Sequence, residues 1–518
     1  MDKLSGLEIP DSHQSPAFER VMLTVVKGGG ILFAGKVLLS ASRLITAILL
    51  ARLLSVEQFG LYSLAISASG IIVGISLLGL EVAQVRFVAI AASRKDEVGL
   101  WGAFQIGIGL TTLLSVITST GLFAIAYPIA ANFFHEPRLA PLLQFACLIV
   151  PFLVSNEVLG GTTRGLKNMH HAVIAQDIFQ PLIRLILIVI LGIAGLTARQ
   201  AIIIFGISGG ISALLLLIFL NKQFSLRRPI GVDLRNVRKM LTFSLPLWLS
   251  NLMVTFRNNL EAILLGSLNT ITNVGIFRAV SQVNLLGEMV YSSIINSARP
   301  TIAELHDRGD REQLGQMYQT VTKWIMTLNL PVFLIIVLFP EPILSVFGKS
   351  FVNGASALAI MAWASFVNSG TGMCSSIIDM TGYSKLKLLN TLVRLVSSLV
   401  LNIFLIPRWG IMGAAITALI VEIVVNFLAI LEVWILFRLL PYKNGILTPM
   451  LAGMAAFTAV YLINHLSAWR ENPLWLVVSL LVMFSVYIGV ILGLGLDPED
   501  RMLLSHLQKR AKSIITSS

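Results

Sequence analysis

Nine basic side chains lie within stretches of sequence that are otherwise apolar, or at the ends of those stretches. A charge at the centre of a helix in lipid costs roughly 2.5–3.5 kcal/mol even by low estimates, so a deep charge usually faces a wet cavity, a partner or a ligand. The chemistry open to this set is electrostatic binding of an anion. The nine are Lys36, Arg43, Arg86, Arg184, Arg257, Arg278, Arg299, Lys323 and Arg394.

Lys36, Ser40 and Arg43 follow one another at spacings of four and three residues, which puts them on one face of a helix. Arg43 is deep in its apolar stretch, so this face cannot look at lipid. Arg86, Arg299 and Lys323 differ, because each is close enough to the predicted inner surface for its charged end to reach the water there, and we assign those three a structural role.

A second polar stripe consists of Ser250, Arg257 and Glu261, spaced seven and four residues apart on a later helix. Together with Arg184, Arg278 and Arg394 at comparable depths, the two stripes define six candidates for binding an anionic ligand in a cationic cavity. They are Arg43, Arg257, Lys36, Arg278, Arg184 and Arg394.

Seven acidic residues in the apolar stretches could neutralise these cations, two fewer than the cations themselves. They are Glu81, Glu157, Asp177, Glu261, Glu288, Asp379 and Glu422. Some cations should therefore be left for an anion. For Lys36, Arg43 or Arg257 taken singly, a ligand contact and an internal ion pair both satisfy the cost of burial.

The elements that position these residues follow from composition. Of the 518 residues, 56% are hydrophobic and 12% are charged, and the mean hydropathy is +0.84. Several apolar runs are long enough to cross a hydrocarbon core of roughly 30 Å as helices. They lack the alternation of a β-barrel strand. We predict an all-α, polytopic membrane protein of about 14 transmembrane helices.

Basic residues flank these helices unevenly. With the N-terminus inside, only six of the 38 Lys and Arg residues fall in outer loops, which predicts that both termini are cytoplasmic. We find no motif for a metal, a nucleophile or nucleic-acid binding, and no soluble domain large enough for a conventional active site. The residues alone therefore predict no catalytic site and no cofactor.

An internal repeat divides the chain. Residues 47–65 align without a gap with residues 262–280 at an offset of 215, matching Gly60 with Gly275 and Tyr62 with Phe277. Six helices per half give both halves the same orientation, so an axis along the membrane normal should relate them, with the site between them. The predicted parts are an N-terminal cytoplasmic segment (1–27), a six-helix half (28–221), a basic linker (222–239), a second six-helix half (240–438), two additional helices (446–496) and an amphipathic cytoplasmic tail (497–518).

Two segments resemble a known family. VEQFGLYSLA at 56–65 and ARPTIAELHDRGDREQL at 298–314 are similar to signatures of polysaccharide flippases. These belong to the polysaccharide transporter branch of the multidrug/oligosaccharidyl-lipid/polysaccharide exporter superfamily and are related to lipid II flippases. The resemblance implies a twelve-helix core with two additional helices.

The resemblance also implies a function. Such a protein would move an undecaprenyl-diphosphate-linked oligosaccharide across the cytoplasmic membrane by alternating access, without breaking a bond, and a cationic cavity suits the diphosphate. The expected partners are this substrate, membrane lipids and polysaccharide biosynthesis enzymes, with no nucleic acid and with a monomer favoured. Candidates for coupling to H+, Na+ or the membrane potential are the acids Glu81, Asp177, Glu261 and Glu288.

Two alternatives stay open at this point. One is a cation-coupled multidrug exporter of the same superfamily, which would favour an acidic cavity and is opposed by the excess of cations. The other is a membrane polysaccharide polymerase or ligase, which would use the same lipid-linked sugars. Such enzymes usually carry a sizeable outer loop, and the largest outer break here, around residues 340–353, is short.

Overall fold

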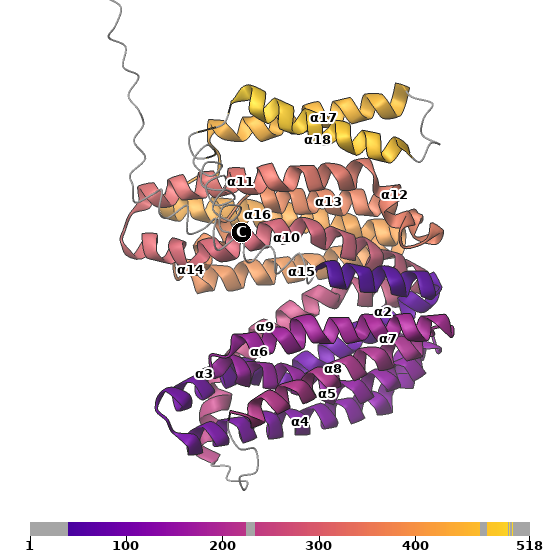
Figure 1. The fold of residues 1–518 in the computed structure, drawn as a ribbon, viewed down its shortest axis with the longest axis vertical. Helices are drawn as coiled ribbons and strands as arrows, with labels where there is room; N and C mark the ends of the chain where they lie inside the picture. Colours follow the sequence, from indigo (N-terminus) through magenta and orange to yellow (C-terminus); the bar gives the residue numbers. More distant parts are fainter. Residues whose placement is uncertain (1–39, 224–233, 467–473, 496, 498–499, 501–518) are drawn as a thin grey trace, which may run out of the picture.

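The computed structural model describes residues 40–223, 234–466, 474–495, 497 and 500, and this part of the chain is helical without a strand (Figure 1). Within it, eleven helical segments are long and apolar enough to cross a membrane. Two further helices, α9 and α10, are longer but more highly charged, and a fourteenth helical stretch covers 40–53. The prediction of a polytopic all-α membrane protein of about 14 helices is confirmed.

The first half is built from apolar helices whose ends are set by polar caps. The Ser55 hydroxyl accepts a hydrogen bond from the Gln58 backbone N–H at 3.2 Å, and Thr197 with Gln200 forms a capping box. Its elements are the helix 40–53, α2 (Val56–Leu77), α3 (Leu80–Ser93), α4 (Glu97–Pro128), η1 (Ile129–Phe133), α5 (Leu139–Gly165), α6 (Met169–Ala172), η2 (Val173–Phe179), α7 (Gln180–Ile193) and α8 (Ala198–Asn221).

The second half repeats this plan, and α9 begins at Leu234, within the predicted linker. Its elements are α9 (Leu234–Leu268), α10 (Ile271–Asp307), α11 (Arg311–Leu338), α12 (Pro340–Ser345), η3 (Lys349–Gly354), α13 (Ala355–Gly370), α14 (Cys374–Met380), α15 (Ser384–Trp409) and α16 (Ile411–Phe437). The short η4 (Asn444–Ile446) then leads into α17 (Leu447–Leu466) and α18 (Leu474–Leu494). Residues 1–39, which include Lys36 and the predicted N-terminal segment, lie outside the described part.

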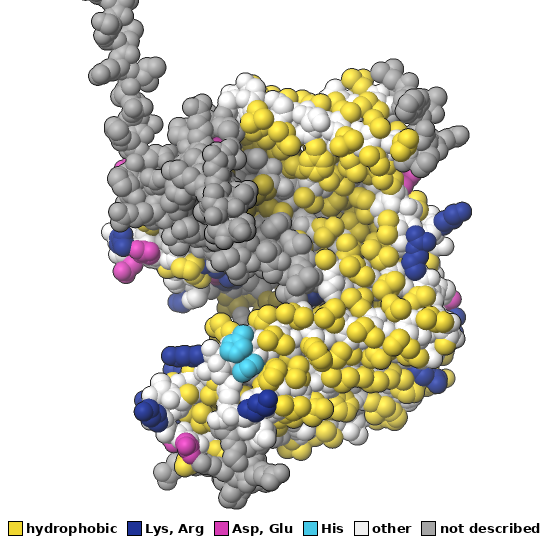
Figure 2. Space-filling model, in the orientation of Figure 1, with side chains coloured by type: hydrophobic (Ala, Val, Ile, Leu, Met, Phe, Trp, Pro, Cys, Tyr) yellow, Lys and Arg dark blue, Asp and Glu magenta, His cyan; other side chains and the backbone are white. Residues whose placement is uncertain are grey.

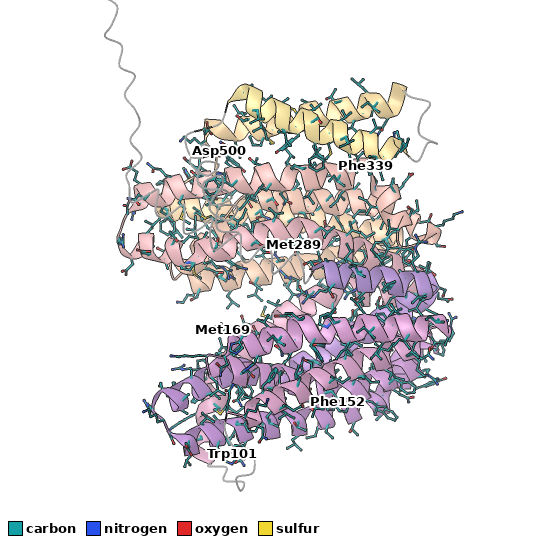
Figure 3. All side chains as sticks on the ribbon, viewed as in Figure 1. Trp101, Phe152, Met169, Met289, Phe339 and Asp500 are labelled. Atoms are coloured by element: carbon teal, nitrogen blue, oxygen red, sulfur yellow. The ribbon has the colours of Figure 1, made fainter. Side chains whose placement is uncertain are left out.

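The hairpin of α17 and α18 packs on the outer side of α11 (Figure 1). Figure 3 shows Phe339 and Asp500 at opposite ends of this contact. The Phe339 ring lies 5.6 Å from the ring of Trp475, and the Tyr487 hydroxyl donates to the backbone carbonyl of Thr327 at 2.9 Å. Apolar packing and one buried hydrogen bond therefore fix the hairpin to the second half.

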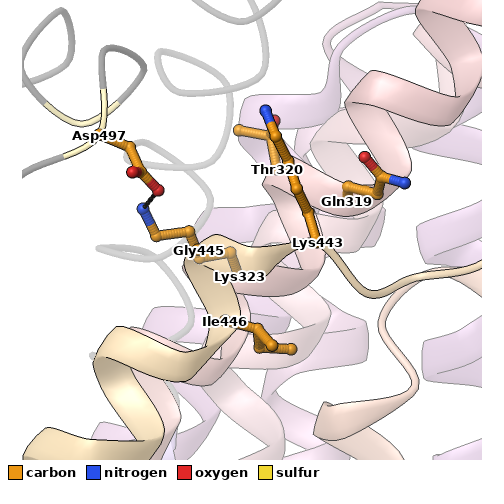
Figure 4. A pocket seen from close by; sticks show the side chains of 7 residues that line it. All are labelled: Gln319, Thr320, Lys323, Lys443, Gly445, Ile446 and Asp497. Carbon is orange, nitrogen blue, oxygen red and sulfur yellow. Dashed lines mark hydrogen bonds and ion pairs between the residues drawn. The ribbon is translucent and has the colours of Figure 1, made fainter.

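Lys323 joins both ends of that hairpin to α11 (Figure 4). Its ammonium group pairs with Asp497 and, at 2.5 Å, with Asp500, and the Trp324 indole N–H donates to Asp500 at 3.0 Å. The start of the hairpin lies against the same group, because Gly445 has room for no side chain beside Asp497. Lys323 is thus structural, as predicted, but through buried ion pairs. Of the predicted tail, 498–499 and 501–518 lie outside the described residues.

The two halves touch most closely where α2 and α10 begin, which we call the closed end. The Arg52 guanidinium spans the halves there, donating to the backbone carbonyls of Val346 at 2.7 Å and Ser345 at 3.0 Å. At the opposite or open end, where α6 and α14 lie, the surface is hollowed between the halves (Figure 2). The helices therefore enclose a space that reaches only one end of the bundle.

Candidate functional site

A cavity of about 960 Å³ lies between the two halves. Its volume is near the upper end of the range for small-molecule sites, and polar side chains contribute much of its lining. Eight of the ten residues singled out from the sequence line it. They are Arg43, Asp177, Arg184, Arg257, Glu261, Arg278, Glu288 and Arg394.

The lining follows the internal repeat. Seven pairs of lining residues are related by the offset of 215 found in the sequence: Ser42 and Arg257, Arg43 and Asn258, Thr46 and Glu261, Ala47 and Ala262, Tyr62 and Phe277, Ser63 and Arg278, and Ile66 and Ser281. Corresponding faces of the first two helices of each half therefore meet across the cavity. This agreement extends the repeat to positions 42 and 66, outside the aligned segment.

Four arginines occupy one level of the cavity, and we call them the arginine layer: Arg43, Arg184, Arg257 and Arg278. Counted along their helices, they lie ten, nine and eleven residues before, and seven residues after, the helix termini at the closed end. With a rise of 1.5 Å per residue, they are about 10 to 17 Å from that end. Guanidinium groups from both halves thus converge deep in the cavity.

No carboxylate of the described residues lies within ion-pair distance of any of these four guanidinium groups. Arg184 donates to the Ser208 hydroxyl at 3.3 Å and lies over the Phe205 ring, 4.0 Å from its centroid. Arg257 donates to the Asn258 side-chain oxygen at 2.9 Å. Neutral partners orient these arginines without cancelling their charge, which leaves the layer able to attract an anion.

Arg394 has a different environment. It forms a two-pronged ion pair with Glu422 of the neighbouring α16, with one contact at 3.1 Å, and Glu422 also accepts from the Asn426 amide at 2.9 Å. This carboxylate neutralises the guanidinium in place. The sequence gave no indication of the pair, since the partners are 28 residues apart on different helices.

Acidic residues gather closer to the open end. Glu157 lies 18 residues after the start of α5, Asp177 16 residues before the end of α7, and Glu288 17 residues after the start of α10. These counts place them about 24 to 27 Å from the closed end, below the arginine layer. The cavity therefore carries its charges in two levels, which a count of cations and anions does not reveal.

Three charged lining residues were absent from the predicted site: Glu157, Arg164 and Glu422. The two acids were recognised as intramembrane charges without a role. Arg164 precedes Gly165, the last residue of α5, and in sequence it reads as part of a polar loop. Tyr62 was also missed, although its ring lines the cavity close enough to Arg184 and Arg278 to feel both charges.

Glu81 is not part of the cavity lining. Leu78 and Gly79 adopt left-handed backbone conformations (φ 46° and 70°), which separate α2 from α3 and give Glu81 a new direction. Its carboxylate accepts from the Asn251 amide of α9 at 3.1 Å, at a contact between the halves. The break between the two helices explains why helical spacing misplaced it.

Glu261 lies within a chain of polar groups. The Ser398 hydroxyl donates to its carboxylate at 3.4 Å, and the Asn402 amide donates to Ser398 at 3.3 Å. The Asn402 side-chain oxygen and the Thr417 hydroxyl are buried without a hydrogen-bond partner. Within the described residues no group of three or more His, Cys, Asp or Glu side chains could hold a metal ion.

The fold is similar to that of solved membrane transporters. A lipid II flippase in an inward closed conformation superimposes with a TM-score of 0.73 at 13% identity, covering 89% of this chain and 98% of that structure. A multidrug-resistance transporter of the MATE family, in an inward-facing conformation, gives a TM-score of 0.62 at 16% identity, covering 77% and 96%. These similarities establish the fold.

Curated relatives share part of the sequence. A "probable flippase" of Haloferax volcanii is 25% identical over 264 residues, covering 49% of this chain and 54% of the relative. A "probable low-salt glycan biosynthesis flippase" of the same organism is 22% identical over 193 residues, covering 37% and 40%. This chain thus spans about half the length of the curated relatives it matches.

Two family models match the sequence. The MatE model matches residues 246–404, and the model described as "Polysaccharide biosynthesis protein" matches residues 25–306, which are more than half of the chain. The protein is a multi-pass membrane protein that belongs to the polysaccharide biosynthesis protein family.

Proposed function

We propose that this protein is a flippase that translocates a lipid-linked glycan across the cytoplasmic membrane by alternating access. Its substrate would be an oligosaccharide joined through a diphosphate to a polyprenyl lipid such as undecaprenol, moved from the inner to the outer leaflet with no bond broken. The family and the names of the curated relatives support this class of cargo. Enzymes that assemble the glycan would be its partners in the pathway.

The observation that carries the proposal is the arginine layer. Four guanidinium groups, from helix 40–53, α7, α9 and α10, face one cavity without carboxylate partners at ion-pair distance. Holding like charges together in a low-dielectric site is costly unless an anion joins them. A diphosphate supplies that anion, and guanidinium groups bind phosphoryl oxygens through charge-assisted hydrogen bonds. Arg394 is left out of this set, because Glu422 already neutralises it.

The distribution of basic residues gives the two ends their sides. The loops predicted to be cytoplasmic lie at the open end, so the cavity would face the cytoplasm and the closed end would face outward. Substrate would enter from the inner leaflet, with the polar head group in the cavity and the lipid chain remaining in the bilayer. This conformation is the one expected to receive the substrate before transport.

For coupling to H+ or Na+ we propose Glu261, rather than the other acids named from the sequence. The Ser398 hydroxyl contacts its carboxylate, and Asn402 continues the chain with a buried oxygen that has no partner. Oxygen atoms left in this way suit a small cation or a proton. Glu81 lies outside the cavity, while Asp177 and Glu288 lie nearer the open end.

A second candidate function is cation-coupled export of drugs, favoured by the MatE match over residues 246–404. Acidic residues in the lower level of the cavity are compatible with a cationic cargo. The two functions differ in the charge of the cargo. Purified protein in liposomes should move a lipid-diphosphate-linked glycan between leaflets and leave a cationic dye untouched; transport of the dye without transport of the lipid would favour the exporter.

A further inference from the structure

The cavity lies on the local two-fold axis that relates the halves. A contact across such an axis is reciprocal: if one residue touches the partner of a second, the second touches the partner of the first. Gly60 lies against Ile271, and Gly275 lies against Val56, where Val56 and Ile271 are themselves 215 residues apart. The axis therefore passes between α2 and α10. The seven repeat-related pairs of lining residues surround its continuation into the cavity.

The arginine layer divides evenly across this axis. Arg43 and Arg184 belong to the first half, and Arg257 and Arg278 to the second. In each half the first helix contributes one arginine and one short neutral polar side chain next to it, since Ser42 precedes Arg43 and Asn258 follows Arg257. Each half therefore offers two guanidinium groups to whatever lies on the axis.

We propose that the anion site is bipartite and that each half binds one phosphoryl group of a diphosphate. This inference rests on the proposed function and specifies how the substrate is recognised. A diphosphate joining a lipid to a sugar carries one negative charge on each of two phosphoryl groups, linked by a bridging oxygen. A pair of like groups matches a site made of two like halves, whereas a monophosphate fills only one of them.

The pairing gives the diphosphate a mechanical role. One phosphoryl group on Arg43 and Arg184 and the other on Arg257 and Arg278 would join the two halves through the ligand. A ligand can shift a conformational equilibrium only by as much as its affinity differs between the two states. A bridged diphosphate favours states in which the two pairs of arginines are close, while a monophosphate has no such preference.

The two sides of the site are not identical. Tyr62 and Ser63 of the first half present hydroxyl groups where the second half has Phe277 and Arg278. The second side is therefore the more positive at this position, and the first side has more neutral hydrogen-bond donors. The two phosphoryl groups of an asymmetric substrate would meet different surroundings, which gives the substrate one orientation in the cavity.

The test is the stoichiometry and affinity of simple phosphates on the full-length purified protein, measured by calorimetry with inorganic phosphate and inorganic diphosphate. We expect the wild-type protein to bind two phosphates or one diphosphate. Arg43→Gln and Arg257→Gln should each retain one phosphate and lose about tenfold in diphosphate affinity, while Arg43→Lys, which keeps the charge, should retain more of it. Arg408→Gln, an exposed arginine outside the cavity, serves as the matched control.

A single phosphate on the wild-type protein, or equal losses of phosphate and diphosphate affinity in the two variants, would overturn the bipartite site. The same preparations are assayed for translocation of a lipid-diphosphate-linked glycan. Translocation by a protein that binds one phosphate contradicts the bipartite site alone. Two bound phosphates without translocation support the bipartite site and contradict the proposed function.

Discussion

Gly60 of α2 and Gly275 of α10 meet so closely at the closed end that neither position has room for a methyl group. A Cβ atom on Gly60 would lie 2.1 Å from the backbone oxygen of Ile271, and one on Gly275 would lie 2.4 Å from that of Val56. Both obstacles are backbone atoms, which cannot move aside as a side chain can. The contact of two glycines therefore lets the halves seal this end of the cavity.

Gly60→Ala should force α2 away from α10 and loosen the seal. With Ser281→Cys as a reporter in the cavity, we expect a membrane-impermeant thiol reagent added from outside to label Gly60→Ala several-fold faster than its parent. Gly109→Ala is the matched control, because a Cβ there meets no atom within 4 Å. Equal labelling rates in all three proteins would show that this contact is not the outer seal.

Glu261→Gln should uncouple transport from the driving ion. The substitution keeps the size of the side chain and removes the charge that Ser398 contacts. In liposomes with an imposed H+ or Na+ gradient, translocation by the variant should lose its dependence on the gradient. Glu341→Gln, an exposed acid on α12, should behave as wild type. A variant that keeps the wild-type dependence on the gradient would exclude Glu261.

Acid should weaken a cluster outside the spanning segments. Arg138 binds Glu136 at 2.6 Å and Glu57 at 2.5 Å, and its hydrogen bond lowers the pKa of Glu136 below the usual 4.5. A carboxyl with a lowered pKa contributes its full stability above its unfolded pKa and loses that contribution as the pH falls through the folded value.

The corresponding measurement is the melting temperature of the purified protein between pH 7 and pH 3. Glu136→Gln should melt lower than wild type at pH 7, and the difference should shrink as the pH falls through the lowered pKa of Glu136. Glu341→Gln should follow wild type throughout. A difference between Glu136→Gln and wild type that stays constant with pH would contradict the assigned ion pair.

The α17–α18 hairpin should depend on Lys323. Replacing both Asp497 and Asp500 by Asn leaves its ammonium group, which is 8% exposed, without a charged partner. Removing one side of a buried ion pair typically destabilises by about 3 kcal/mol, and the Trp324 hydrogen bond to Asp500 weakens as well. Unfolding of the double variant should show this loss, whereas Asp307→Asn at an exposed position should not. Wild-type stability in the double variant would contradict the role of the ion pairs.

Most of the fold could be predicted because hydrophobicity and helix length leave few arrangements in a membrane. The stripe containing Arg43 and the stripe containing Arg257 were identified for the same reason, since a polar face on an apolar helix must avoid lipid. The offset of 215 carried more information than expected. It relates pairs of cavity residues such as Ser63 and Arg278, which hydrophobicity alone does not connect.

Contacts between helices could not be predicted in this way. The pairing of Arg394 with Glu422 depends on how α15 and α16 pack, and one sequence does not specify that packing. The position of Glu81 depends on the left-handed conformations at Leu78 and Gly79, which interrupt the helical spacing used for the prediction. Arg164 was assigned to a loop because α5 extends further than its apolar stretch.

The central claim is that guanidinium groups from both halves bind the anionic group of a lipid-linked substrate. The most direct measurement is the rate at which a lipid-diphosphate-linked glycan appears on the far leaflet of liposomes containing the Arg43→Ala/Arg257→Ala double variant, compared with Arg408→Ala at equal protein levels. Loss of two charge-assisted contacts, each worth roughly 1.5–3 kcal/mol, should lower the rate at limiting substrate by about a hundredfold or more. A double variant that translocates the glycan at the rate of the control would contradict the account.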